Sequence, residues 1–157
     1  MTASKAFAAA DGDSRPSPTM ASDTVFELHL AARSRTLKIV RAAVTALGED
    51  AGCSLKATEE LVSAVDEACQ NVIRHAYKKE CDGRIVIKAS CEGDRLVLRV
   101  VDFAEPVDPE KIRPRPLDEL RPGGIGTRVI RACVDEVAFE TPQQGAGNCL
   151  RLIKRIS

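Results

Sequence analysis

Tryptophan is absent from this sequence of 157 residues, and all aromatic residues together make up only 3% of it. Apolar residues nevertheless account for 44% of the chain, so a hydrophobic core must be built from Val, Ile, Leu and Ala. With 29% charged residues, this balance is typical of a soluble globular protein, and the length suits one domain of ordinary size.

The chain also lacks an excess of charge of either sign, because 23 Lys and Arg residues balance 23 Asp and Glu residues. Without such an excess, the chain has no overall electrostatic field that would favour binding to nucleic acid or to an anionic membrane surface. The basic cluster at the C-terminus, "RLIKRIS", alternates charged with apolar residues, which is typical of a strand with one solvated face. We therefore predict no direct nucleic-acid partner.

Paired CxxC spacing is missing from the six cysteines, which argues against a structural metal site. Most of them stand in apolar periodic segments, where Cys behaves as a small hydrophobe, and we interpret them as reduced thiols. No apolar run is long enough to span a bilayer, and the N-terminus is too weakly apolar for a signal peptide. The sequence predicts a cytoplasmic protein without membrane contact.

Changes of composition along the chain indicate its organisation. Residues 1–22 are rich in Ala, Ser, Pro and Asp and lack periodicity, so we predict a flexible tail before a single domain over 23–157. Within that domain, 104–122 combines five prolines with many charges. Long connections of this kind are often functional lids, and we interpret this one as a lid.

Hydrophobic periodicity predicts the secondary structure of the domain. Ser34 is the expected cap of the first helix, and "CEG" is the expected hairpin turn. The predicted order is strand 24–30, helices 34–51 and 55–78, strands 84–90 and 94–103, a helix opened by "GGIG", and strands 135–140 and 149–156. Hairpins with segregated helices favour an α+β fold, a two-layer sandwich with a mixed, mostly antiparallel sheet and its helices on one face.

The second predicted helix carries two stripes of side chains. Its buried stripe consists of Leu61, Val65, Ala68, Val72 and Ala76. On a polar stripe, Glu67 and Asn71 are four residues apart and project from one face. That stripe is open to two interpretations: the solvent side of an amphipathic helix, or a site in which an amide oxygen ligates Mg²⁺ and a carboxylate accepts a proton.

An acidic residue ends the second hairpin strand. Leu96, Leu98 and Val100 share a face, and the period of two places Asp102 on the same, inward face. Acidic residues at strand ends are common turn formers. Alternatively, a carboxylate aimed into a cavity can accept a hydrogen bond from an exocyclic amine such as that of adenine.

The glycines of "PGGIGT" precede the third predicted helix. Glycine permits close backbone approach, and free N–H groups at a helix start bind phosphate. The cluster also suits a plain loop-to-helix junction. It is neither a Walker A loop nor a dinucleotide fingerprint, because "GxxxxGK[ST]" is missing and no strand precedes it.

These features follow one another in a specific order: the Glu-x-x-x-Asn helix, the inward Asp, the lid, and the glycines. In that order the sequence resembles the Bergerat-fold (GHKL) superfamily and, within it, the bacterial anti-sigma-factor serine/threonine kinases, the RsbW-like proteins. The resemblance covers about residues 24 to 156. It is carried by "AVDEACQNVIRHAY" (similar to the N box), "VVDFAEPVDPEKI" (G1), "GGIGTRVIRACVDEV" (G2) and "GNCLRLIKRI" (terminal strand).

The resemblance implies a role for each matching residue. Glu67 would be the catalytic base, Asn71 the Mg²⁺ ligand, and Asp102 the partner of the adenine amino group. Ala104 departs from the family, whose G1 pattern has glycine at this position. The implied ATP contacts are Asn71, Asp102, Ala104, Gly123, Gly124, Ile125, Gly126 and Thr127.

The implied function is that of an ATP- and Mg-dependent serine/threonine protein kinase acting as an anti-sigma-type regulator. Its implied partners are a STAS-type antagonist, which it would phosphorylate, a sigma factor, and a second copy of itself. Two alternatives stay open. One is a nucleotide-gated binding module, for which a base such as Glu67 is not needed; the other is an ATPase that uses water.

Overall fold

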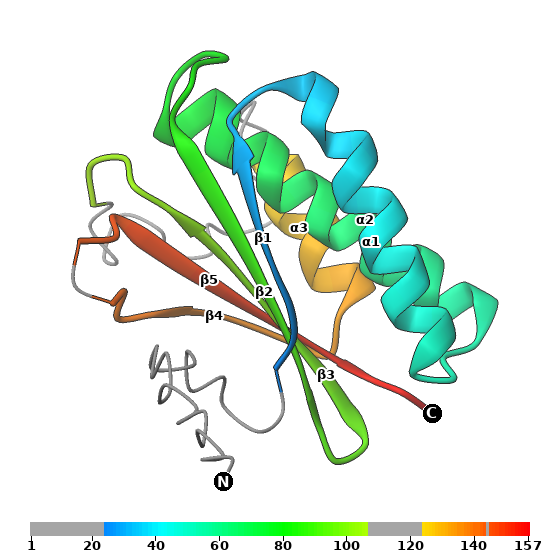
Figure 1. Cartoon of the computed structure of the whole chain (residues 1–157). Coiled ribbons are helices and arrows are strands. Elements are labelled where there is room, and N and C mark those ends of the chain that lie inside the picture. Colours follow the sequence, from blue (N-terminus) through cyan, green and yellow to red (C-terminus); the bar gives the residue numbers. More distant parts are fainter. Residues whose placement is uncertain (1–23, 107–123, 144) are drawn as a thin grey trace, which may run out of the picture.

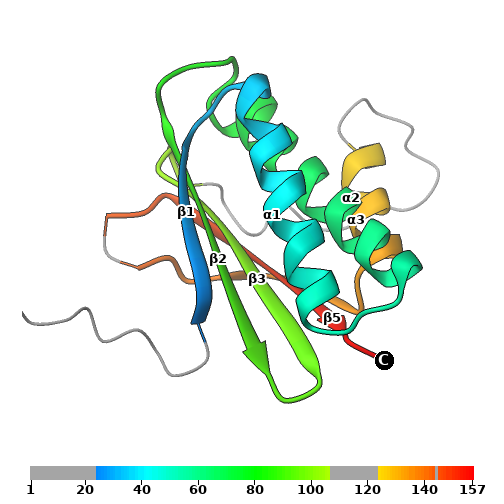
Figure 2. The ribbon, with the colours of Figure 1, turned by 45° about the vertical axis from the view of Figure 1, so that its right-hand side comes forward.

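The structure, a computed structural model, describes residues 24–106, 124–143 and 145–157 and has two layers (Figure 1). One layer is a five-stranded sheet, and the helices cover one face of it, as the view turned by 45° also shows (Figure 2). The elements are β1 (Thr24–Ala31), η1 (Ser34–Thr36), α1 (Leu37–Asp50), α2 (Leu55–Asn71), η2 (Val72–Ala76), β2 (Arg84–Glu92), β3 (Arg95–Asp102), α3 (Gly124–Cys133), β4 (Glu136–Glu140) and β5 (Asn148–Arg155).

The predicted α+β sandwich is confirmed, with one difference in the sheet. The strand order is β1-β2-β3-β5-β4, and every pair of neighbours among the described strands is antiparallel. The chain crosses from β3 to β4 through α3, and these two strands run in the same direction. Since β5 lies between them, no parallel ladder forms, and the described sheet is not mixed. The predicted tail 1–22 and the lid beyond residue 106 lie outside the described residues.

The core lies between the helices and the sheet, as the periodicities predict. Leu61 and Val65 of α2 are fully buried in one cluster with Leu98 of β3. On the opposite face of β3, Val97 is only 1% exposed, and Val101 belongs to a second, small cluster with Val86 and Cys149 of the adjacent strands. A hairpin joins β2 to β3, and Gly93 supplies the positive φ of +63° that the first position of a type II′ turn requires.

The first helix does not begin as predicted. Ser34 lies in the 3₁₀ turn η1, and its backbone N–H donates to the Glu80 carboxylate at 2.7 Å, while the α-helix begins at Leu37. Thr36 precedes that helix but gives no side-chain cap, because its hydroxyl donates to the carbonyls of the preceding turn. The second helix has an ordinary cap, since the Ser54 hydroxyl accepts from the Ala57 N–H at 3.1 Å.

The long second helix changes its winding at the predicted polar stripe. It is α-helical through Asn71 and continues as the π-helical turn η2, closed by the Tyr77 N–H on the Val72 carbonyl at 2.9 Å. Lys78 follows with a φ of +65° and ends the helix. Five-residue π turns are rare in proteins and are frequent at functional sites.

All six cysteines are free thiols, in agreement with the interpretation from the sequence. Cys69 is fully buried in the core, and burial raises the pKa of its thiol to about 12. Within the described ranges, none of the helices has the length and apolar content needed to cross a membrane.

Candidate nucleotide site

Asp102 is the centre of a hydrogen-bonded junction at the end of β3. Its side chain is buried, as the strand alternation predicts, with the residue only 4% exposed. The Oδ1 atom accepts from Asn148 Nδ2 at 2.9 Å and from the Ala104 N–H at 3.0 Å. Within the described part of the chain, Oδ2 accepts no hydrogen bond, which leaves it available to a donor from a ligand.

Burial also sets the protonation behaviour of this carboxylate. It raises the pKa of Asp102 above its usual value, although the hydrogen bonds from Asn148 and Ala104 act in the opposite direction. A carboxylate kept from water strengthens its remaining interactions, because the local dielectric is low. The junction therefore presents one open acceptor oxygen on a carboxylate that is otherwise buried.

A glycine directly before β5, the strand next to β3, makes this junction possible. The Gly147 N–H donates to the Asp102 carbonyl at 2.8 Å, and a Cβ at Gly147 would stand 1.9 Å from the Ala104 carbonyl oxygen. Ala104 itself does not adopt a positive φ, so its departure from glycine carries no backbone strain. The close approach at this site is made by Gly147, which the sequence analysis missed; its signal was the glycine of "GNCL" directly before the last strand.

Replacing Gly147 with alanine is expected to destabilise the fold by about 1–3 kcal/mol, the range typical of overpacking. The new Cβ meets a backbone atom, which cannot rotate away, so β5 or residue 104 must shift. Urea unfolding would measure the loss. The matched control is Gly145→Ala, where a Cβ has open space but φ is +90°. If Gly147→Ala costs no more than the control, the steric account is wrong.

Tyr77 ties the end of the second helix to the ends of two strands. Its hydroxyl donates to the Arg84 carbonyl at 2.8 Å and accepts from the Phe103 N–H at 3.0 Å. The ring packs so tightly against Gly83 that a Cβ there would lie 2.5 Å from it. Because Phe103 follows Asp102 directly, this clamp holds the end of the helix that carries Asn71 beside the Asp102 junction. Sequence reasoning did not assign Tyr77 a role.

Two polar rows on α2 differ in their partners. Asp66 accepts from Arg41 of α1 at 2.7 Å and from Gln70 Nε2 at 2.7 Å, so its row is an ordinary paired surface. Glu67 and Asn71 are also half-buried, yet neither side chain has a hydrogen bond or ion pair in the part of the chain that the structure describes. This contrast favours a ligand site over a plain solvent face for Glu67 and Asn71.

The glycine-rich segment is described only in part. α3 begins at Gly124, so this residue and Gly126 lie in its first turn, whereas Gly123 lies outside the described residues. Thr127 is exposed. α3 packs beside α2 and begins towards the end at which α2 terminates (Figure 1). The sequence predicts an apolar stripe of Ile125, Val129, Ile130 and Cys133 on this helix, and Ile130 is buried as expected, at 3% exposed.

One residue of that predicted stripe is misplaced. Val129 is 38% exposed, because the buried side of α3 runs through Ile130 and Val134, and Val129 lies about 100° away around the helix. This error leaves the start of α3 unaffected.

The residues that could hold a metal ion are few. No cluster of three His, Cys, Asp or Glu side chains occurs among the described residues, so a cage built entirely from protein ligands is absent there. Mg²⁺ commonly binds through one or two protein oxygens together with substrate phosphates and water. The unpaired amide of Asn71 fits that mode.

Comparison with known proteins identifies the family. Residues 30–154 match the histidine kinase-like ATPase domain. The serine-protein kinase RsbW of Listeria monocytogenes is 33% identical over 118 residues, which is 70% of this chain and 75% of the relative. RsbW of Bacillus subtilis is 29% identical over 122 residues, covering 73% and 76%.

A solved structure of the RsbU and RsbW domains of a Mycobacterium tuberculosis protein shares the fold, with a TM-score of 0.56 at 19% identity. The similarity covers 84% of this chain and 32% of that longer one. The family match covers most of the chain, and the two-layer fold agrees with it. The chain therefore belongs to the family of histidine kinase-like ATPase domains and is similar to the RsbW serine-protein kinases within it.

Proposed function

We propose that this protein is an ATP- and Mg-dependent serine/threonine protein kinase that regulates a partner by phosphorylation. One observation carries the proposal: Glu67 and Asn71 are half-buried and have no partner among the described residues, at the end of α2 that Tyr77 clamps beside Asp102. The names of the relatives, which are serine-protein kinases, support the same class of reaction.

Asp102 would bind the base of the nucleotide. Its open Oδ2 can accept from the adenine 6-amino group, while Oδ1 stays held by Asn148 and Ala104. Backbone N–H groups of the segment from Gly123 to Thr127 would approach the phosphates, in the way that helix starts bind anions. Asn71 would hold Mg²⁺, which supplies charge neutralisation of the phosphates when bound.

Glu67 would act as the general base. The hydroxyl oxygen of a partner Ser or Thr forms a bond to the γ-phosphorus of ATP, the bond from that phosphorus to the β–γ bridging oxygen breaks, and ADP leaves. The hydroxyl proton passes to the Glu67 carboxylate. Phosphoryl transfer depends mainly on positioning and charge stabilisation, so a base on a rigid helix beside the phosphates is adequate.

The partners belong to this proposal as well. The substrate would be a STAS-type antagonist, and a sigma factor would be the second client of an anti-sigma regulator acting in the cytoplasm as a homodimer. The resemblance to the anti-sigma-factor kinases suggests these partners, and the names of the relatives, serine-protein kinase RsbW, support the kinase part of the assignment.

The experiment that tests the function uses intact mass spectrometry. The full chain is incubated with Mg·ATP and a co-encoded STAS protein, and the expected result is the gain of one phosphate on the partner. Tight ATP binding without transfer would instead establish the nucleotide-gated binding module. Release of inorganic phosphate without a partner, at an equal rate with it, would establish the ATPase.

Substitution of Asn71 by alanine is expected to remove the Mg²⁺ dependence of nucleotide binding. The amide has no structural partner among the described residues, so the fold should tolerate its loss. Calorimetric titration of ATP with and without Mg²⁺ measures the effect. The control is Gln70→Ala, which removes a neighbouring amide that pairs with Asp66. Unchanged Mg²⁺ dependence in Asn71→Ala would remove this residue from the site.

A further inference from the structure

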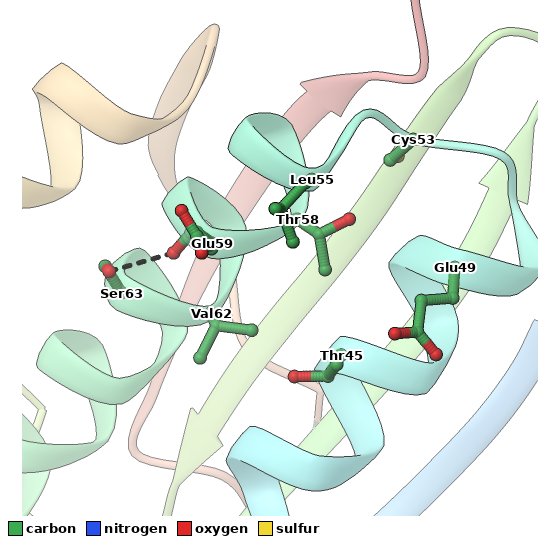
Figure 3. A pocket seen from close by; sticks show the side chains of 8 residues that line it. All are labelled: Thr45, Glu49, Cys53, Leu55, Thr58, Glu59, Val62 and Ser63. Carbon is green, nitrogen blue, oxygen red and sulfur yellow. Dashed lines mark hydrogen bonds between the residues drawn. The ribbon is translucent and has the colours of Figure 1, made fainter.

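An open hollow lies between the last turns of α1 and the first turns of α2 (Figure 3). It is an open cleft of about 730 Å³, and Glu49, Leu55, Thr58, Glu59 and Val62 contribute to its walls. The candidate nucleotide site is at the other end of α2, so Leu55 and Asn71 are about 24 Å apart along the helix axis. The cleft is thus separate from the proposed chemistry.

The cleft exposes apolar surface that folding does not need. Leu55 is the first residue of α2 and is 75% exposed, although a polar residue would serve equally well at a helix start. Val62 stands two turns further along the same wall and is only partly buried. Together they form an apolar strip that can cover the apolar face of another helix.

The hydroxyl of a largely buried residue also points into the cleft. Thr58 is 4% exposed, and its side chain has no hydrogen-bond partner in the described part of the chain. In Figure 3 the Thr58 oxygen points into the space between the two helices. Gly48 of α1 lies so close that a Cβ there would stand 2.6 Å from this oxygen. The Thr58 oxygen is therefore accessible from the cleft and can hydrogen-bond to a polar group of a bound partner.

The rim of the cleft carries unpaired negative charge. Glu49 and Glu59 make no ion pair in the described part of the chain, whereas the adjacent Glu60 is paired with Lys154 at 2.7 Å. Glu49 and Asp50 also occupy the last turn of α1, which holds no basic residue. Carboxylates at this negative end of the helix dipole are unfavourable for the isolated fold. A cation brought by a partner would relieve that repulsion.

We propose that this cleft is a docking site for a basic amphipathic helical segment of a partner protein. Apolar side chains of that segment would cover Leu55 and Val62, and its Lys or Arg side chains would pair with Glu49 and Glu59. The carboxylate rim repels nucleic acid and anionic membranes, so a basic protein segment is the partner that the charge complements. The site goes beyond the proposed kinase function and operates with or without nucleotide.

The test uses a synthetic peptide of about 18 residues, five helical turns, built from Leu and Lys with the period of an amphipathic helix. The probe is titrated into the ¹⁵N-labelled full chain, and a matched peptide with Glu in place of Lys serves as the negative probe. Chemical-shift changes are expected within residues 45–63 for the Lys peptide only. Added Mg·ATP should leave them unchanged.

Variants make the test specific. Leu55→Ala and the pair Glu49→Gln/Glu59→Gln are each expected to weaken binding about tenfold, which fluorescence anisotropy would measure. The pair Glu92→Gln/Glu136→Gln removes the same charge from the strands and is expected to leave the affinity unchanged. The proposal is overturned if the peptide does not bind, if its shifts map elsewhere, or if both charge pairs weaken it equally. Self-association abolished by Leu55→Ala would also overturn it, because a second copy would then fill the cleft.

Discussion

Replacement of Asp102 by asparagine is expected to lower the affinity for ATP at least ~100-fold while the protein stays folded. The substitution preserves shape, and the side-chain oxygen can still accept from Asn148 and Ala104 as Oδ1 does now. The amide nitrogen then replaces the open Oδ2. Two donors, this nitrogen and the adenine 6-amino group, would face each other, so a hydrogen bond becomes a repulsive contact.

The same substitution is not expected to lower stability at neutral pH. Burial raises the native pKa of Asp102 above 3.8, so the native state binds this proton more tightly than the unfolded state does. The free energy of unfolding therefore falls as pH rises from 3.8 through the raised pKa of Asp102, and it stays at the lower value at higher pH. Asparagine carries no charge, so the variant does not lose this stability. Thermal unfolding across this pH range would show a smaller decline for the variant.

Comparing the affinities for inosine triphosphate and ATP distinguishes the loss of one contact to the base from general damage to the site. Its 6-oxo group accepts a hydrogen bond, so Asp102→Asn should gain affinity for it relative to ATP. Calorimetric titration of both nucleotides measures the ratio. If the variant binds ATP as the parent protein does, Asp102 does not contact the adenine amino group. If both nucleotides are lost along with the fold, the hydrogen-bond account of the junction fails instead.

Glu67→Gln is expected to slow phosphoryl transfer to the partner about 10²–10⁴-fold, the usual contribution of a general base. Nucleotide affinity should stay unchanged, because the carboxylate would act on the partner hydroxyl and the amide occupies the same volume. Phosphorylation of the STAS partner is followed over time by intact mass, and ATP binding is measured separately by titration.

The neighbouring carboxylate provides a matched control. Asp66→Asn removes the same charge one residue away, but Asp66 belongs to the paired row and contacts Arg41 and Gln70. It should reduce stability slightly and leave transfer within about twofold, since pairs of this exposure contribute at most ~1 kcal/mol. Equal rates for Glu67→Gln and the parent protein would exclude Glu67 as the base. Equal losses in both variants would indicate a general charge effect.

Much of the fold could be predicted because its periodicities are local. The buried stripe of α2 and the inward direction of Asp102 follow from chain geometry alone, with periods of 3.6 and two residues. The beginning of α1 could not be predicted this way. Ser34 lies in a 3₁₀ turn before the helix, and its N–H donates to Glu80, a residue 46 positions away, so a contact distant in the chain holds this turn.

By itself, the sequence determined the α+β class and the order of its elements, and it predicts which residues would form a nucleotide site. Only the tertiary structure decided that Asp66 is paired while Glu67 and Asn71 are not, since α1 supplies Arg41 to one row of α2. It also decided that Gly147, rather than residue 104, makes the close approach, and that Tyr77 joins the helix end to Phe103. The reason is physical: a pattern shows which way a side chain points along its own element. Partners and steric limits come from elements that are distant in the chain.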